Sequence, residues 1–243
     1  MSGFAAPKRI LVEIILDVSD PWSYVAWRRL EETIQRCGAA DRSRAGSAAG
    51  VEGRAKRFDV QTRALPCVLD HKLPAAEALR WLRRLPTEPQ RFTSELVRCA
   101  RKVGLSGAKF RNNNVARRVN TTQSHALLRY AERVASLATQ SELLGLIFNS
   151  FLGDGPFPNE SALLKHAAAV GLDVDAARSY MQCREANTTV RMESDDYIKR
   201  GVKQLPFLVM NGKAILAGFC KHEVIEECFE KCPMQPPLGK VLD

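Results

Sequence analysis

The N-terminal part of the chain changes from a strand pattern to a helix pattern and back. Residues 10–18 are apolar and largely β-branched, which is typical of a buried strand. Apolar side chains then recur at helical spacing over residues 22–36, and Asp20 and Pro21 before them are residue types favoured at a helix start. Strand character returns at residues 58–65. The pattern predicts a β-α-β unit.

The remaining segments have different characters. Residues 38–54 contain almost no large apolar side chain and predict a flexible surface insertion. Residues 66–200 show mostly helical periodicity and predict about six helices. Residues 201–232 predict two short strands joined by the Asn-Gly hairpin signal at 211–212, then a final helix, and a Pro-rich tail covers 233–243. Periodicity alone leaves several α/β folds open.

Composition places the chain among ordinary folded proteins. Hydrophobic residues make up 45% and charged residues 26% of the chain, which argues against a disordered or fibrous class. No apolar run approaches the roughly 20 residues that a membrane-spanning helix needs, so we expect no membrane insertion. The first residues lack the apolar segment of a secretory signal, and Lys8 and Arg9 precede any acidic residue. This start suggests a short mitochondrial leader, with the cytoplasm as the alternative location.

The seven cysteines are scattered and include no C-x-x-C pair. An odd number of cysteines in a chain without an export signal predicts reduced thiols. Cys228 and Cys232 stand four residues apart on a predicted helix, but two thiols alone do not make a zinc site. We therefore expect no metal.

Positive charge is concentrated in one segment. The formal net charge is +9, and residues 80–118 contain eleven basic residues against two acidic ones. Such a block suits an acidic or RNA-containing partner, whereas a solvated helix face is the alternative interpretation. The candidate binding patch is Arg80, Arg83, Arg84, Arg91, Arg98, Arg101, Lys102, Lys109, Arg111, Arg117 and Arg118.

Four motifs carry a resemblance to a known family. They are Asp-Val-Ser-Asp-Pro-Trp-Ser-Tyr-Val-Ala at 17–26, Phe-Asp-Val-Gln-Thr-Arg-Ala-Leu at 58–65, Asn-Thr-Thr-Gln-Ser-His at 120–125, and Gly-Val-Lys-Gln-Leu-Pro-Phe at 201–207. They resemble motifs of the DsbA-like oxidoreductases of the FrnE branch, which also includes 2-hydroxychromene-2-carboxylate isomerase and kappa-class glutathione transferase. The resemblance covers nearly the whole chain.

This resemblance implies an α/β, thioredoxin-like fold with an inserted all-helical domain. Residues 8–65 and 201–232 would form the thioredoxin-like part, and residues 66–200 the helical insertion. The Leu205–Pro206 bond is implied to be cis and to face the active site. His125 matches a motif histidine, although a packed or capping residue is the simpler interpretation of one histidine on a helix.

The redox cysteines of the family are missing. Asp20 and Ser23 stand where the redox members have the first and second cysteine. A carboxylate cannot attack a disulfide, and a serine cannot resolve a mixed disulfide. The degenerate site comprises Ser19, Asp20, Pro21, Trp22, Ser23, Leu205 and Pro206. Asp20 is well suited instead to cap the helix.

Three functions fit these observations. The first is a non-catalytic binding or scaffold subunit of a larger assembly, such as a mitochondrial ribosome, with no cofactor. The second is a glutathione-dependent isomerase or transferase with a site rebuilt around Ser19, Ser23 and Pro206. The third is an oxidoreductase using displaced cysteines, which requires two thiols to meet near the cis proline. Cys220 is the one candidate close in sequence to the Asn-Gly hairpin. The sequence does not define an oligomeric state.

Overall fold

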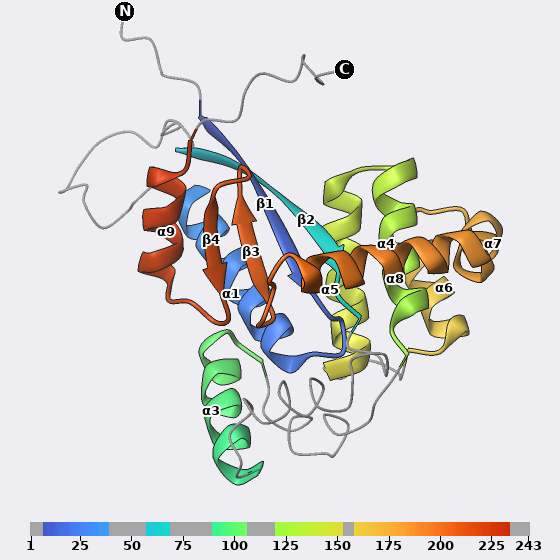
Figure 1. Ribbon diagram of the computed structural model, residues 1–243, viewed down its shortest axis with the longest axis horizontal. Helices are drawn as coiled ribbons and strands as arrows, with labels where there is room; N and C mark the ends of the chain where they lie inside the picture. Colours follow the sequence, from blue (N-terminus) through green and yellow to red (C-terminus); the bar gives the residue numbers. More distant parts are fainter. Residues whose placement is uncertain (1–6, 39–56, 69–88, 106–119, 153–157, 234–243) are drawn as a thin grey trace, which may run out of the picture.

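A four-stranded sheet organises the molecule (Figure 1). The computed structural model describes residues 7–38, 57–68, 89–105, 120–152 and 158–233. The strands are β1 (Lys8–Leu16), β2 (Phe58–Pro66), β3 (Phe207–Met210) and β4 (Ala214–Ala217). Their order is β2-β1-β3-β4, with β1 parallel to β2 and antiparallel to β3. This mixed sheet confirms the predicted α/β thioredoxin-like class.

The helices lie close to the predicted segments. Between β2 and β3 the described residues contain six helices. The helices of the described chain are α1 (Pro21–Gly38), α3 (Pro89–Lys102), α4 (Thr122–Val134), α5 (Leu137–Leu152), α6 (Glu160–Ala169), α7 (Val174–Gln182), α8 (Arg184–Lys199) and α9 (His222–Lys231). The predicted insertion at 38–54 falls almost wholly outside the described residues, as does most of the tail. The division into an N-terminal part, an inserted helical domain and a C-terminal part stays a prediction.

The two faces of β1 pack against different elements. Ile10, Val12 and Ile14 alternate along one face and share a core cluster with residues of α1, α5 and α9. Ile15 points to the other face and belongs to a smaller cluster with Leu205. The end of α8 packs against this cluster. The strand is thus covered on both sides, which explains its nearly continuous apolar sequence.

Aromatic residues join α1 to the helical segment. Phe148 of α5 stacks on Tyr24 with ring centroids 4.9 Å apart and lies 5.5 Å from the ring of Trp27. All three are buried. Gly145 permits this approach, because a Cβ atom there would lie 2.8 Å from the Trp27 ring. This aromatic cluster therefore packs α1, which begins at the candidate site, against α5.

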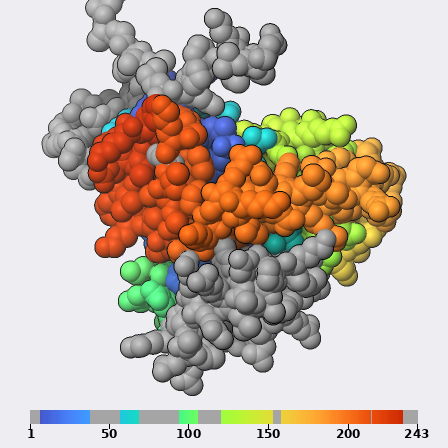
Figure 2. Space-filling model, in the orientation of Figure 1, coloured from blue at the N-terminus to red at the C-terminus, as the bar shows by residue number. Residues whose placement is uncertain are grey.

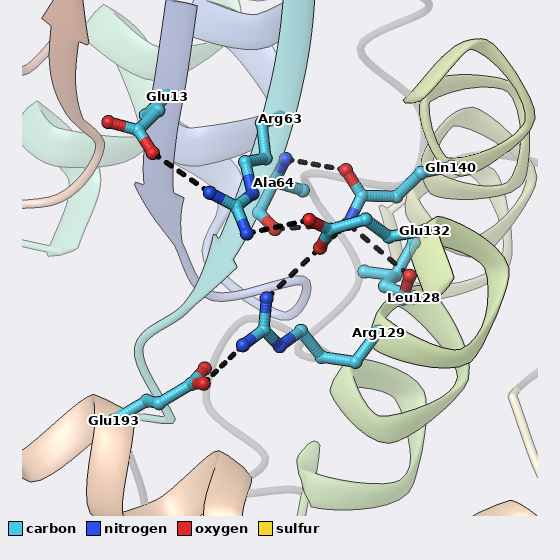
Figure 3. A network of polar contacts seen from close by, with 8 residues as sticks. All are labelled: Glu13, Arg63, Ala64, Leu128, Arg129, Glu132, Gln140 and Glu193. Atoms are coloured by element: carbon cyan, nitrogen blue, oxygen red, sulfur yellow. Dashed lines mark hydrogen bonds and ion pairs between the residues drawn. The ribbon is translucent and has the colours of Figure 1, made fainter. Parts of the chain in front are cut away.

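A polar network links the sheet to α4, α5 and α8 (Figure 3). Arg63 on β2 pairs with Glu13 of β1 at 3.3 Å and with Glu132 of α4 at 2.7 Å. Glu132 also pairs with Arg129, which contacts Glu193 of α8. Gln140 of α5 exchanges hydrogen bonds with the backbone of Ala64 on the same strand. Because positive and negative charges alternate along it, the network positions the helices on the sheet. Within the described residues, no helix has the length and apolar content to cross a membrane.

Candidate functional site

Three chain segments meet at one end of the sheet. The register of β1 with β2 and β3 brings together the turn after β1, Cys67 after β2 and the Leu205–Pro206 peptide before β3. The Leu205–Pro206 bond is cis, as the resemblance implied. The residues of the degenerate site predicted from the sequence therefore come from separate segments that meet at this end of the sheet.

Asp20 caps the first turn of α1. Its carboxylate accepts hydrogen bonds from the backbone N–H groups of Trp22, at 3.3 Å, and Ser23, at 2.8 Å. The Ser23 hydroxyl donates to the same carboxylate at 2.6 Å, and Ser23 is fully buried. Pro21 occupies the first helical position, where its missing N–H costs nothing. Asp20 and Ser23, the side chains at the family's cysteine positions, are therefore hydrogen-bonded to each other.

A second carboxylate lies three residues before Asp20. Asp17 is buried, and its Oδ1 accepts from both the backbone N–H and the hydroxyl of Ser19, each at 2.8 Å. Its Oδ2 accepts from the hydroxyl of Thr121, at the start of α4, at 3.2 Å. Ser19, a candidate replacement nucleophile in the transferase hypothesis, is thus engaged with Asp17. The helical segment contacts the site through Thr121.

Burial raises the pKa of Asp20 to about 6. The hydrogen bonds from Ser23 and Trp22 favour the carboxylate, whereas the nearby charge of Asp17 opposes it, and desolvation is the largest effect. Asp20 therefore changes its charge just below neutral pH. The chemistry available at this position is the exchange of a proton, because a carboxyl group forms no mixed disulfide.

The sheet topology, the cis peptide and the helix capped by Asp20 agree with a comparison to protein-family models, in which one family matches most of the chain. The profile of the DSBA-like thioredoxin domain family covers residues 11–227. The protein belongs to this family. A search of curated proteins finds no match.

Solved structures share the fold of this DSBA-like protein. A probable DsbA oxidoreductase from Streptomyces coelicolor is 20% identical, with a TM-score of 0.61, covering 96% of this chain and 94% of its own. A 2-hydroxychromene-2-carboxylate isomerase is 15% identical, with a TM-score of 0.58 and coverages of 91% and 95%. The cytosolic disulfide reductase DsbM from Pseudomonas aeruginosa, solved with GSH, is 13% identical, with a TM-score of 0.53 and coverages of 91% and 93%. At these identities the likeness concerns the fold alone.

Cys67 lies at the site of this DSBA-like protein, although no pattern in the sequence predicts it there. Its backbone N–H donates to the carbonyl of Leu16 at 2.9 Å, and its side chain is fully buried. Burial raises the pKa of the Cys67 thiol to about 12, and the charges of Asp17 and Asp20 add to the effect. The reactive thiolate is therefore scarce at neutral pH. The position of Cys67 follows from the parallel register of β1 and β2, which sequence periodicity does not reveal.

The other predicted site residues are held by packing. Trp22 is half-buried, with its ring 6.4 Å from that of Phe219. His125 is buried on α4, and burial lowers its pKa, which favours the neutral ring. Burial also raises the pKa of the Cys220 thiol, so that this displaced cysteine is not an activated nucleophile. Within the described segments, no group of three or more His, Cys, Asp or Glu side chains is placed to hold a metal.

The predicted basic patch is described only in part. Arg98, Arg101 and Lys102 lie on the exposed side of α3, and its buried side, with Leu96 and Ala100, faces the core. Figure 2 shows α3 at the lower left of the molecular surface. The side chain of Arg91 in α3 lies outside the description. Outside the described residues altogether are Arg80, Arg83, Arg84, Lys109, Arg111, Arg117 and Arg118.

Proposed function

We propose that this DSBA-like protein does not catalyse thiol–disulfide exchange and acts as a binding subunit. The observation that carries the proposal is the Asp20–Ser23 pair, joined by a 2.6 Å hydrogen bond at the positions of the family's two cysteines. A carboxylate and a serine hydroxyl cannot form or resolve a mixed disulfide. Cys67, which lies at the same end of the sheet, is buried, and the pKa of its thiol is raised to about 12.

The purified chain is expected to show no insulin reduction above the uncatalysed rate. Neither Asp20 nor Ser23 can take part in thiol exchange, and thiolate forms at Cys67 only at very high pH. The measurement is turbidity during insulin reduction with dithiothreitol, compared with a DsbA-type enzyme that carries both cysteines. Catalysis that disappears in the Cys67→Ser variant would contradict the proposal and identify Cys67 as the nucleophile.

Glutathione is the ligand of the alternative function. The DsbM neighbour was solved with GSH, and this is the observation that favours a glutathione-dependent activity. Against it, an ionised Asp20 would place a negative charge where the thiolate of glutathione would have to lie. Calorimetric titration with glutathione separates the two functions, because a transferase, isomerase or reductase that depends on glutathione has to bind it, whereas the binding subunit should not.

The binding surface we propose is the exposed side of α3. Arg98, Arg101 and Lys102 project from it, and the one ion pair between described residues there joins Arg98 to the exposed Glu95 at 3.8 Å. Exposed pairs of this kind contribute little free energy, so the cations remain available to a partner. We propose an RNA-containing assembly as that partner, for example a mitochondrial ribosome, because phosphates match a dense basic segment.

Reversing three charges on α3 is expected to weaken binding to ribosomal particles. Each lost phosphate contact lowers the slope of log affinity against log salt by about 0.7 to 0.9. The Arg98→Glu, Arg101→Glu, Lys102→Glu variant should therefore lose about two units of slope in co-sedimentation between about 50 and 200 mM salt. Each exposed site should change the free energy of unfolding by less than about 0.5 kcal/mol.

A matched control uses three exposed basic residues distant in sequence from α3. Lys199, Arg200 and Lys203, at the end of α8 and just after it, carry the same total charge. Their reversal to Glu should leave co-sedimentation unchanged. Equal binding by the α3 variant and the wild type would contradict the docking surface. Binding that survives ribonuclease treatment would identify an acidic protein as the partner instead of RNA.

A further inference from the structure

A buried polar cluster joins the middle of α1 to the start of α9. Arg29 and Thr33 lie one helical turn apart on α1, and both hydrogen-bond to the imidazole of His222, the first residue of α9. Arg29 is 8% exposed, and Thr33 is fully buried. From α3, the thiol of Cys99 lies near enough to Arg29 to be affected by its charge. The cluster therefore fixes the start of α9 on α1.

The hydrogen bonds of Thr33 define the protonation of His222. The Thr33 hydroxyl donates its single proton to the carbonyl of Arg29 at 2.8 Å. The 2.7 Å hydrogen bond between Thr33 Oγ1 and His222 Nδ1 is therefore donated by the imidazole. A guanidinium group has only donors, so Nε2 of His222 accepts from Arg29 and carries no proton. This arrangement requires a neutral His222.

One carboxylate lies within reach of both Arg29 and His222. The Oε2 atom of Glu32 is 3.5 Å from Nη1 of Arg29 and 3.6 Å from Nε2 of His222. A proton on Nε2 would remove the acceptor of the Arg29 guanidinium and bring two positive charges together. The same proton gives His222 a donor that Glu32 can accept. Protonation of His222 therefore exchanges its partner Arg29 for Glu32.

The charges around His222 favour the neutral ring at neutral pH. Burial lowers the pKa of His222 below its ordinary value of 6.5, and the charges of Arg29 and Arg36 add to this effect. Glu223, the next residue of α9, opposes it. Arg36 itself pairs with Glu226 of α9 at 3.9 Å. The closed arrangement therefore persists at neutral pH and is lost in acid.

The cluster contacts the candidate site through Phe219. The guanidinium group of Arg29 lies over the Phe219 ring, 5.2 Å from its centroid. On the site side, the Phe219 ring lies 6.4 Å from that of Trp22 in the first turn of α1. Gly218, the preceding residue, donates its N–H to the carbonyl of Pro206 at 2.8 Å. The segment 218–222 thus connects the cis-proline segment, the start of α1 and the start of α9.

We infer that His222, Arg29 and Glu32 form an acid-sensitive latch on the segment 218–222. Protonation of His222 breaks its hydrogen bond with Arg29, pairs the ring with Glu32, and releases the segment together with the first turn of α9. The Phe219 ring then loses its cationic neighbour and separates from the start of α1. The inference goes beyond the proposed function and does not rest on it, because the latch lies outside α3.

Hydrogen exchange of the full chain, followed by mass spectrometry, tests this inference at about pH 7.5 and about pH 5. The latch needs a neutral ring, so its stabilisation is complete above about 6.5 and is lost as pH falls toward the lowered pKa of His222. Linkage to one proton limits the loss of protection to about tenfold per pH unit. After correction for the intrinsic exchange rate, residues 218–225 should lose at least about threefold in protection relative to α5.

Three variants identify the group responsible. His222→Gln offers an acceptor and a donor but does not titrate, so residues 218–225 should be equally protected at both pH values. Asp20 titrates in the same range, and its effect would persist in this variant. His166→Gln is the matched control, because His166 is also half-buried with a pKa lowered by burial, but lies on α6. It should respond as the wild type does, whereas Glu32→Gln should move the loss of protection to lower pH.

Titration of His222 by NMR in the wild type gives a second measurement that does not depend on a variant folding. The ring should titrate below 6.5. The inference is wrong if residues 218–225 keep their protection at about pH 5, or if His222→Gln loses as much protection as the wild type. It is also wrong if His222 titrates at or above 6.5, or if α5 loses protection equally, which would indicate global unfolding.

Discussion

Replacing Asp20 and Ser23 together by cysteine is expected to give the chain a thiol–disulfide exchange activity that it lacks. The N–H groups of Trp22 and Ser23 already point at the carboxylate of residue 20, at 3.3 and 2.8 Å. The same groups would stabilise a thiolate, and thiols at helix starts have pKa values lowered to about 3.5 to 7.5. Insulin reduction should rise from the uncatalysed rate, and the thiol at position 20 should titrate below its ordinary pKa of about 8.5.

The single variant Asp20→Cys is the matched control. It places the same thiol at the helix start but leaves Ser23, which cannot resolve a mixed disulfide. We expect it to accumulate a mixed disulfide with the substrate, visible by mass spectrometry, without turnover. If the double variant shows neither exchange nor a lowered thiol pKa, the start of α1 is not the activating position that we have assigned.

The Asp20→Asn variant is expected to be more stable than the wild type at neutral pH but not at about pH 4. The pKa of Asp20 in the folded chain is about 6, against 3.8 when unperturbed, so the folded state holds the proton more tightly. Its contribution to stability is present below the unfolded pKa and is lost as pH rises through about 6. A shift of this size corresponds to roughly 3 kcal/mol, and partial solvent access to Asp20 brings our expectation nearer to about 2 kcal/mol.

Urea unfolding of both proteins from about pH 4 to 7.5 measures this effect, and the difference between the two curves cancels the titration of other groups. Asn keeps an oxygen that can accept from the Ser23 N–H, so the cap is preserved. Asp173→Asn is the control, because Asp173 caps α7 in the same way, accepting from Ala176 at 2.7 Å, but is exposed. A difference between wild type and Asp20→Asn that does not change with pH would show that Asp20 is not desolvated.

Local signals predicted the elements of the fold well. The Asn211-Gly212 turn joins β3 to β4 as expected, because both residues adopt the positive φ that this hairpin needs. Asp20 and Pro21 marked the start of α1 because capping depends only on the next few residues. Strand β1 begins and ends two residues before the predicted segment, since Asp17 and Val18 turn toward α1. Such shifts reflect pairing with neighbouring strands, which the periodicity of one segment does not contain.

Contacts between segments that are distant in the chain could not be predicted from the sequence. The Arg63 network takes its carboxylates from β1, α4 and α8, and no spacing in the chain links them. Cys67 is at the site because β2 pairs in parallel with β1. The basic segment at residues 80–118, in contrast, is evident in the sequence. The sequence does not identify the partner that would bind it.

The central strand finds its second neighbour very late in the chain. Val12 of β1 pairs with Met210 of β3, so nearly the whole polypeptide lies between the two partners. Contacts of such large sequence separation are slow to form, because a long loop must close before they contribute any stability. During synthesis, the edge of β1 that pairs with β3 therefore stays unpaired until β3 has left the ribosome. An open strand edge is a template for pairing with other chains. A nascent or truncated chain that ends before residue 207 is thus the form of this protein most prone to aggregation.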